Sequence, residues 1–300
     1  MLRKLLNRLV SSGGAPTPTA RRERSTASAC EIADRIIAEG NRAEGEGRLR
    51  EACERYRKAV DAAPEYSKAH LNLGVGLEAI GDADGAIKSY ETALVIDPAN
   101  AYASYNLGKL LYARGTLSRA AALLHSALRH QPEFPEAHVV LSSLYDAQGN
   151  LSAAASALEA ALKQQPDWTG ALFNYGTVLS RLGRSAEAEV ALRRVIAIDL
   201  GNADASYHLA NLLYARGAPK DAEKLLRLAV RQKPEFPEAY GALFHVYDSQ
   251  GNLDAAAAAL EMALKQRPDW VGALHNYGTV LRRLKRLAEA ESALRRAIAV

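Results

Sequence analysis

Prolines recur along this chain at a fixed spacing, and that spacing limits the possible folds more than any other feature. Successive prolines are 34 residues apart, and the gap is doubled only where Leu200 stands in the expected place of one of them. These prolines are Pro64, Pro98, Pro132, Pro166, Pro234 and Pro268. Such a period indicates one supersecondary unit repeated along the chain. With this proline as position 32, units begin at residues 33, 67, 101, 135, 169, 203, 237 and 271, and the last is truncated.

Columns of small residues predict that each unit is a pair of closely packed helices. Position 8 is glycine in most units, and position 20 is always alanine, at Ala52, Ala86, Ala120, Ala154, Ala188, Ala222, Ala256 and Ala290. Small side chains let two helices approach each other closely. Position 15 is glycine except at Lys285, and a left-handed glycine there would end the first helix. The proline at position 32 would end the second helix.

Two further columns predict how the helices begin and how units join. Position 18 offers N-caps for the second helices, at Asp84, Ser118, Ser152 and Asp254. Position 34 is aromatic where a hydrophobic staple onto the next helix would sit, at Tyr66, Phe134, Trp168, Phe236 and Trp270. Because the tryptophans keep the repeat register, we favour a packing role for them over a ligand platform.

Together these columns carry a family resemblance over residues 33–300. Glycine at position 8, alanine at 20 and 27, an aromatic residue or leucine at 24 and proline at 32 resemble the tetratricopeptide repeat. The resemblance implies an all-α, right-handed α-solenoid of about eight 34-residue helix–turn–helix repeats, a superhelix whose first helices line a concave groove. It assigns residues 31–300 to the repeat array.

A second, longer period shows that three units were duplicated as a block. Residues 101–198 align with residues 203–300, and about two-thirds of the positions are identical. The same groove chemistry therefore recurs three repeats along, which suits an extended ligand.

Polar and aromatic columns on the first helices supply the candidate binding residues. Position 6 holds Asn72, Asn106, Asn174 and Asn276, with His208 in the sixth unit, and position 9 holds Asn41, Asn211, Thr177 and Thr279. A carboxamide donates and accepts hydrogen bonds at once, so a row of them can hold an extended peptide by its backbone. Tyrosines would add apolar contacts at Tyr105, Tyr112, Tyr207 and Tyr214. The predicted function is a scaffold that binds a partner protein or an extended peptide; solvated asparagines without a binding role are the alternative.

The asparagine column at Asn72, Asn106, Asn174 and Asn276 also resembles the groove of the O-linked N-acetylglucosamine transferase family, although Val140 and Ala242 interrupt it. That resemblance implies a substrate-recognition region for protein substrates. The last unit stops at Val300 inside its second helix, so we expect the chain to continue. The alternative function is therefore the recognition arm of a glycosyltransferase whose catalytic domain lies beyond residue 300.

Residues 1–30 hold six basic residues against one acidic residue, a net +5, so the remaining residues carry −1 of the total +4. A near-neutral body argues against nucleic acid as a partner.

Residues 11–28 have linker composition, so residues 1–30 are expected to be a basic flexible segment. Residues 1–10 could touch a membrane surface as a basic amphipathic helix or be a frayed terminus. No run is long enough to span a membrane, and we expect a cytoplasmic protein.

Side chains suited to catalysis or metal binding do not form a recognisable motif. Cys30 and Cys53 are the only cysteines, and the seven histidines show no paired ligand spacing. No nucleophile, base and orienting group can be named. The sequence therefore predicts no catalytic residue, no metal site and no cofactor in these 300 residues, and it does not indicate an oligomeric state.

Overall fold

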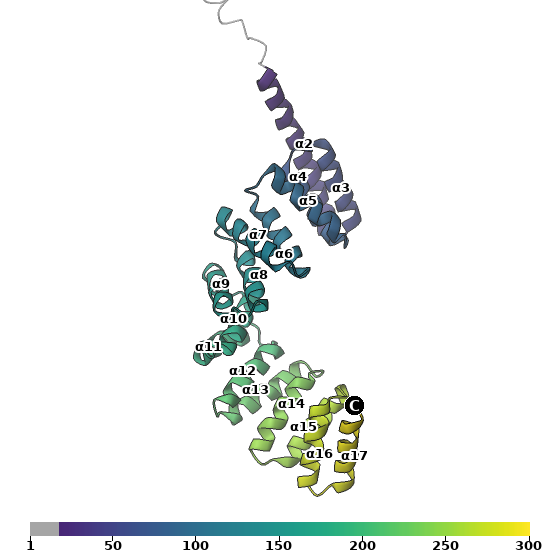
Figure 1. The fold of residues 1–300 in the computed structure, drawn as a ribbon, viewed down its shortest axis with the longest axis vertical. Coiled ribbons are helices and arrows are strands. Elements are labelled where there is room, and N and C mark those ends of the chain that lie inside the picture. The colour runs from purple at the N-terminus through teal and green to yellow at the C-terminus, as the bar shows by residue number, and fades with distance from the viewer. Residues whose placement is uncertain (1–17) are drawn as a thin grey trace, which may run out of the picture. The chain divides into compact units, whose positions relative to one another are not determined.

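The structure is a computed structural model that describes the backbone of residues 18–300 and the side chains of residues 28–300. All regular secondary structure in this described part is α-helical (Figure 1). The helices are α2 (Pro18–Gly45), α3 (Leu49–Ala62), α4 (Ser67–Ala79), α5 (Ala83–Ile96), α6 (Ala101–Ala113), α7 (Leu117–His130), α8 (Pro135–Ala147), α9 (Leu151–Gln164), α10 (Thr169–Arg181), α11 (Ser185–Ile198), α12 (Ala203–Ala215), α13 (Pro219–Gln232), α14 (Pro237–Ser249), α15 (Leu253–Gln266), α16 (Val271–Arg283) and α17 (Leu287–Ala299).

The chain divides into two compact units between Val140 and Leu141. In the first unit, α2 packs on α3, α4 on α5 and α6 on α7, and the second helices α3 and α5 also pack on the first helices that follow them, α4 and α6. In the second unit, the pairs α10–α11, α12–α13, α14–α15 and α16–α17 repeat this arrangement. Helix–turn–helix units stacked through nearest neighbours form an α-solenoid, so the predicted all-α fold class is confirmed.

Glycine at position 15 ends the first helices as expected. These glycines adopt φ between 74° and 85°, and Lys285 takes the same left-handed conformation at φ 62°. At Gly183 the backbone N–H donates to the carbonyl of Ser180, and the next N–H, of Arg184, donates to Leu179. Lys285 and Arg286 make the equivalent bonds. The backbone of Lys285 therefore adopts a left-handed conformation that favours glycine.

The second helices begin two residues earlier than the sequence predicted. Their N-caps lie at position 16, where the side chains of Asp82, Asn150 and Asn252 each accept a hydrogen bond from a backbone N–H three residues later. Position 18 lies within the first helical turn, so Asp84, Ser118, Ser152 and Asp254 are not caps. The reason is the tight turn: the second helix begins two residues after the left-handed glycine, so only position 16 stands between them and can be the cap.

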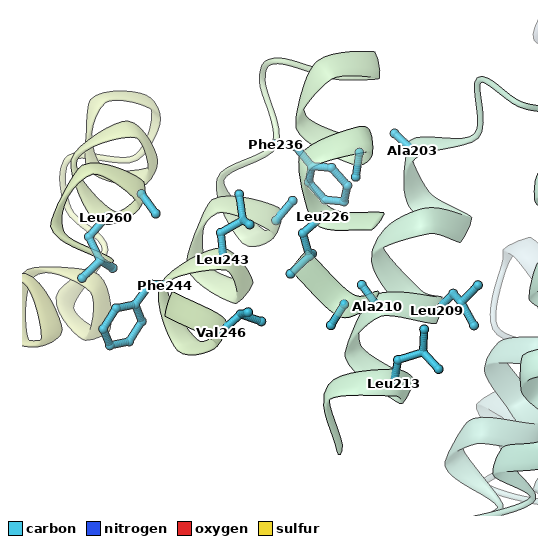
Figure 2. Packing of buried hydrophobic residues seen from close by; sticks show 14 of the residues in the cluster. Ala203, Leu209, Ala210, Leu213, Leu226, Phe236, Leu243, Phe244, Val246 and Leu260 are labelled. Atoms are coloured by element: carbon cyan, nitrogen blue, oxygen red, sulfur yellow. The ribbon is translucent and has the colours of Figure 1, made fainter. Parts of the chain in front are cut away.

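Close approach at positions 8 and 20 forms the core of each pair. The position-20 alanines are 0–4% exposed. A Cβ added at Gly176 would lie only 2.8 Å from Cγ of Leu192, the position-24 residue of the partner helix. Buried side chains then continue from one pair to the next, as Figure 2 shows for Leu209, Leu226 and Leu243.

Residues 18–30 differ from the expected flexible segment. The structure places them in α2, which continues without a break into the first repeat helix. Alanine, arginine and glutamate favour helix, and no proline or glycine follows Pro18 until Gly40. Residues 1–17 lie outside the described residues, and with them the amphipathic-helix prediction for residues 1–10.

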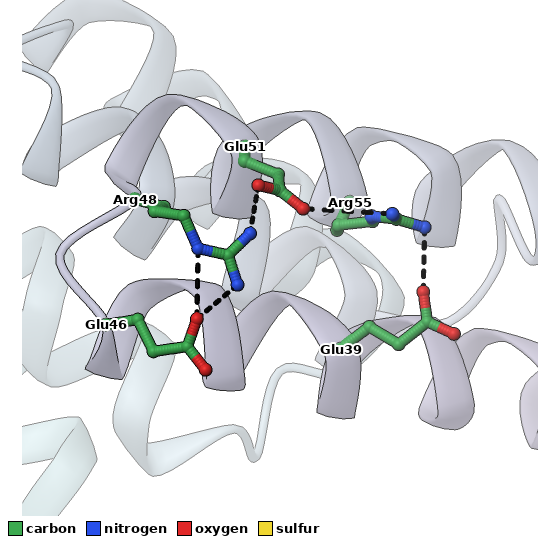
Figure 3. Close-up of polar contacts among 5 residues, drawn as sticks. All are labelled: Glu39, Glu46, Arg48, Glu51 and Arg55. Carbon is green, nitrogen blue, oxygen red and sulfur yellow. Dashed lines mark hydrogen bonds and ion pairs between the residues drawn. The ribbon is translucent and has the colours of Figure 1, made fainter.

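Exposed ion pairs link the first two helices around their turn. Arg48 pairs with both Glu46 and Glu51, and Arg55 reaches from α3 to Glu39 of α2 at 2.8 Å (Figure 3). All five side chains are well exposed, so solvent screens the pairs. The buried alanine and glycine contacts, rather than these charges, hold the two helices together.

Replacing Lys285 by glycine is expected to stabilise the protein. Lys285→Gly removes the cost of a left-handed residue with a Cβ, about 1 kcal/mol. The reciprocal change at the equivalent place of the duplicated block, Gly183→Lys, is expected to destabilise by a similar amount. The urea midpoints of both variants measure the effect, and a lower midpoint for Lys285→Gly would contradict it.

The position of the caps yields a second stability prediction. Asn252→Ala removes the side chain that accepts from Ala255 N and is expected to cost about 1 kcal/mol. Asp254→Ala, two residues later in the same turn, is the matched control and should change stability less. Equal losses in thermal or urea unfolding would mean that position 16 has no special role.

Candidate functional site

Within the second unit, the first helices α12, α14 and α16 border a cavity of about 300 Å³. Its lining combines aromatic rings, two carboxamides and small residues: Tyr207, Asn211, Tyr214, Glu238, Gly241, Ala242, Phe244, His245, Val246, Leu260, Trp270, Gly272, Ala273 and Asn276. Four of the residues expected to bind a partner, Tyr207, Asn211, Tyr214 and Asn276, therefore meet at one place.

Helical spacing explains how α12 presents three of these side chains together. Tyr207, Asn211 and Tyr214 are separated by four and then three residues, so they share one face of the helix. The Tyr214 hydroxyl donates to the carbonyl of His245 at 3.2 Å, which ties α12 to α14. The Tyr207 ring packs at an angle on Phe236, with centroids 5.0 Å apart. Both rings are thereby fixed at the cavity.

Trp270, which directly precedes α16, reaches the cavity because α14 has no side chain in its way. A Cβ added at Gly241 would lie 2.8 Å from Cη2 of the indole. The Arg267 guanidinium lies 5.0 Å from the centroid of the tryptophan ring, within the range of a cation–π contact. Trp270 is therefore both a packing residue and part of the cavity lining, whereas the sequence favoured packing alone.

The carboxylate of Glu238 is the acidic group of the cavity lining, and it is neutralised by a neighbour. Burial acts to raise the pKa of Glu238, but its backbone N–H and the hydrogen-bonded Arg267 outweigh burial, so the pKa lies below its usual value. Glu238 is then an anion at neutral pH, paired with the cation of Arg267. The cavity lining presents no unpaired anion to a ligand.

His208 stands beside the cavity and packs against rings instead of binding a polar group. Its imidazole meets Phe173 and Tyr207 edge to face, with centroids 5.3 Å away in each case. Burial lowers the pKa of His208 below its usual value, although Asp204 acts in the opposite direction. The ring is neutral at pH 7 and belongs to the apolar part of the first-helix face.

Other predicted binding residues lie on the first helices, and several use their polar groups within the fold. Asn41 accepts from the Tyr56 hydroxyl at 2.8 Å, and Asn72 donates to the Lys68 carbonyl at 2.8 Å. Thr177 donates to Asn174 O at 2.8 Å, and Thr279 to His275 O at 3.0 Å. Hydroxyls bonded to their own helix are less available to a peptide than the sequence suggested.

In contrast, three carboxamides of the asparagine column keep their polar groups open. Among the described residues the side chains of Asn106, Asn174 and Asn276 have no hydrogen-bond partner, and all three are half-buried. Tyr105 packs on Phe134 with centroids 4.7 Å apart, and burial raises the pKa of its hydroxyl. Tyr112 is half-buried on the same helix.

The position-34 aromatics pack backward, contrary to the expected staple. Phe134 lies against Tyr102 and Tyr105 of the first helix in its own unit, and Phe236 lies against Tyr207 in the same way. The chain turns after the second helix, which brings position 34 over the first helix of the unit that it closes. This direction of packing is what carries Trp270 to Gly241 of α14.

Sequence reasoning missed the α14 side of the cavity, at Gly241, Phe244 and His245. Phe244 occupies the position where most units have glycine, yet its ring is 6% exposed and points toward Leu260 (Figure 2). The sequence did contain a sign of this site, because these three residues differ from their equivalents in the first copy of the duplicated block. Those equivalents are Val139, Ser142 and Ser143.

The described side chains, residues 28–300, contain no group of three His, Cys, Asp or Glu residues placed to hold a metal ion. Nor is any helix in the described part of the chain long and apolar enough to cross a membrane.

Comparison with family models identifies the repeats. A model described as TPR repeat matches residues 77–115, and two models described as tetratricopeptide repeat match residues 111–174, 179–246 and 242–299. Together the matches span most of the chain. The protein belongs to the tetratricopeptide-repeat family. Stacked repeats of this kind present an extended surface to other proteins, and the protein is a protein-interaction scaffold.

Solved structures with the same fold include YrrB, described as a TPR protein with an unusual peptide-binding site, which is 24% identical over 62% of this chain and 96% of its own, with a TM-score of 0.57. Two structures of MamA are also similar. One is 25% identical over 54% of this chain and 95% of its own, with a TM-score of 0.52. The other is 24% identical over 57% and 94%, with a TM-score of 0.53. No curated protein matches the sequence.

Burial of His208 predicts a contribution to the pH dependence of stability. Its pKa is lowered in the folded chain and near 6.5 when unfolded, so below that pH the unfolded state binds the proton more readily. Stability should therefore fall as the pH drops through 6.5, and His208→Asn should reduce this fall. Urea unfolding at pH 7.5 and 5.5 measures it, with the exposed His130→Asn as control. An unchanged fall in His208→Asn would contradict the prediction.

Proposed function

We propose that this protein binds an extended peptide segment of a partner protein on the face formed by its first helices. In the second unit this binding would centre on the cavity between α12, α14 and α16. The observation that carries the proposal is the meeting of Tyr207, Asn211, Tyr214 and Asn276, all identified from their columns, at that cavity. Catalysis is not part of the proposal.

The open carboxamides support a backbone-directed mode of binding. Asn174 and Asn276 can each donate to a peptide carbonyl and accept from a peptide N–H, because neither group is bonded within the described residues. A peptide in an extended conformation exposes both groups at regular intervals. Binding of this kind holds the main chain and leaves the side chains to be recognised elsewhere.

Aromatic side chains beside the carboxamides would add the apolar part of the binding energy. Tyr207 and Tyr214 are held in place by Phe236 and by the His245 carbonyl, so little side-chain entropy would be lost on binding. The ion pair of Glu238 with Arg267 leaves the lining nearly neutral. These features fit a peptide better than a phosphate-rich or strongly charged ligand.

A selection experiment tests the proposal. Phage displaying random twelve-residue peptides are panned on the full chain, and enriched peptides are synthesised and titrated by fluorescence anisotropy. Asn174→Ala combined with Asn276→Ala is expected to weaken binding about tenfold, since each lost hydrogen bond contributes about 0.5–1.5 kcal/mol. Thermal stability should change little, because neither carboxamide is hydrogen-bonded within the described residues and both side chains are only half-buried.

The matched control is Glu159→Gln with Glu261→Gln, an equivalent pair in the duplicated block on the second helices α9 and α15. It should leave affinity unchanged. If no peptide is enriched by the wild-type chain, peptide binding is wrong. If peptides bind but the asparagine variant retains full affinity, the carboxamides do not hold the backbone.

The recognition arm of a protein glycosyltransferase is the alternative function. It would use the same asparagine column, at Asn72, Asn106, Asn174 and Asn276, and adds a catalytic domain elsewhere in a longer protein. The reading frame downstream of codon 300 tests it. A glycosyltransferase domain there would support the alternative, and an immediate stop codon would contradict it.

A further inference from the structure

The cavity between α12, α14 and α16 lies in the second copy of the duplicated block, and the two copies differ along α14. Residues 241–246 read GALFHV, whereas the equivalent residues 139–144 read VVLSSL, with only the leucine at the third place retained. Other lining residues are the same in both copies, among them Tyr207, Tyr214, Trp270 and Asn276. The two copies therefore share several of the lining residues in sequence and differ in those that α14 contributes.

Three of the differences make the second copy more apolar or less charged. Gly241 stands where the first copy has valine. A Cβ added at Gly241 would lie 2.8 Å from the Trp270 indole, which occupies the space that a side chain would need. Phe244 stands in place of a serine and supplies a buried ring beside Leu260. Asn211 stands in place of Lys109, which removes a cation from the lining.

The lining restricts what could occupy the cavity. Four aromatic rings, of Tyr207, Tyr214, Phe244 and Trp270, surround a volume of about 300 Å³. A charged side chain buried there would find Glu238 already paired with Arg267, so its desolvation would go uncompensated. A bulky apolar side chain would instead exchange water contact for contact with aromatic surface.

The carboxamides in the same lining indicate that this apolar side chain belongs to a peptide. Asn211 projects from α12 and Asn276 from α16, and neither carboxamide is bonded within the described residues. They lie on helices that border the cavity from either side of α14. A peptide whose anchor enters the cavity would meet amide partners for its main chain at both borders.

We propose that the cavity formed by Gly241, Phe244 and Trp270 is an anchor pocket for one bulky apolar side chain, such as phenylalanine or leucine, of a bound extended peptide. This inference rests on the proposed peptide-binding function and adds the side chain that is recognised. The repeat array would then recognise one side chain of the peptide at this pocket, and it would bind the flanking main chain of the peptide with less selectivity.

Peptide titrations test the pocket separately from the function. A peptide enriched on the wild-type chain is synthesised with its shared apolar residue and with alanine in its place. The alanine peptide is expected to bind the wild-type chain about tenfold more weakly or worse, as suits the loss of one buried apolar side chain. In Gly241→Val, which carries the residue of the first copy, the two peptides should bind with equal, weak affinity.

Two further variants keep the test decisive. Ser249→Val places the same side chain on an exposed site of α14 away from the cavity, and it should retain the full difference between the peptides. If Gly241→Val fails to fold, as judged by its circular dichroism and melting, Asn211→Lys replaces it. That variant puts the first copy's cation at a half-buried position of the lining and should reduce the difference.

The outcomes separate the two proposals. If the wild-type chain binds both peptides equally, or if Gly241→Val and Asn211→Lys preserve the difference, the anchor pocket is wrong while peptide binding stands. If panning enriches no peptide at all, peptide binding itself fails, and the anchor pocket fails with it.

Discussion

Every unit of this protein depends on the close approach of its two helices at positions 8 and 20. Alanine at position 20 is almost fully buried in each unit, and glycine at position 8 accepts the large side chain of position 24, as Leu192 against Gly176 shows. No unit could bury this surface alone, so stability accumulates through neighbours. Where the pattern is broken, as at Phe244, a ring occupies position 8 and lies beside Leu260, the position-24 side chain of its own unit.

The use of one helix face for packing is what leaves another face free for binding. On α12 the side chains of Leu209 and Leu213 enter the core, while Tyr207, Asn211 and Tyr214 share the adjacent face. The turn after each second helix folds position 34 back over its own unit, which brings Trp270 to α14. The cavity is thus a product of the same repeat geometry that makes the solenoid, modified by two substitutions, at Gly241 and Phe244.

Much of the fold could be predicted because the repeat period and the columns of small residues act locally. The left-handed glycines are an example, since their backbone conformation follows from the turn alone and recurs even at Lys285. The N-caps were placed two residues too late, because several residues near the turn have capping side chains and only the turn's length selects Asn252 over Asp254. Helix in residues 18–30 was missed because linker composition and helix propensity conflict there.

For the candidate site, the sequence by itself determined which residues occupy the outward columns of the first helices, because a helix repeats its faces every three or four residues. Only the tertiary structure decided which of them meet. It bonded Asn41 to the Tyr56 hydroxyl of the following helix and brought Tyr214 and Asn276 together with Trp270 at one cavity. Such meetings depend on how helices far apart in the sequence pack, and a single Cβ at Gly241 would be enough to prevent this one.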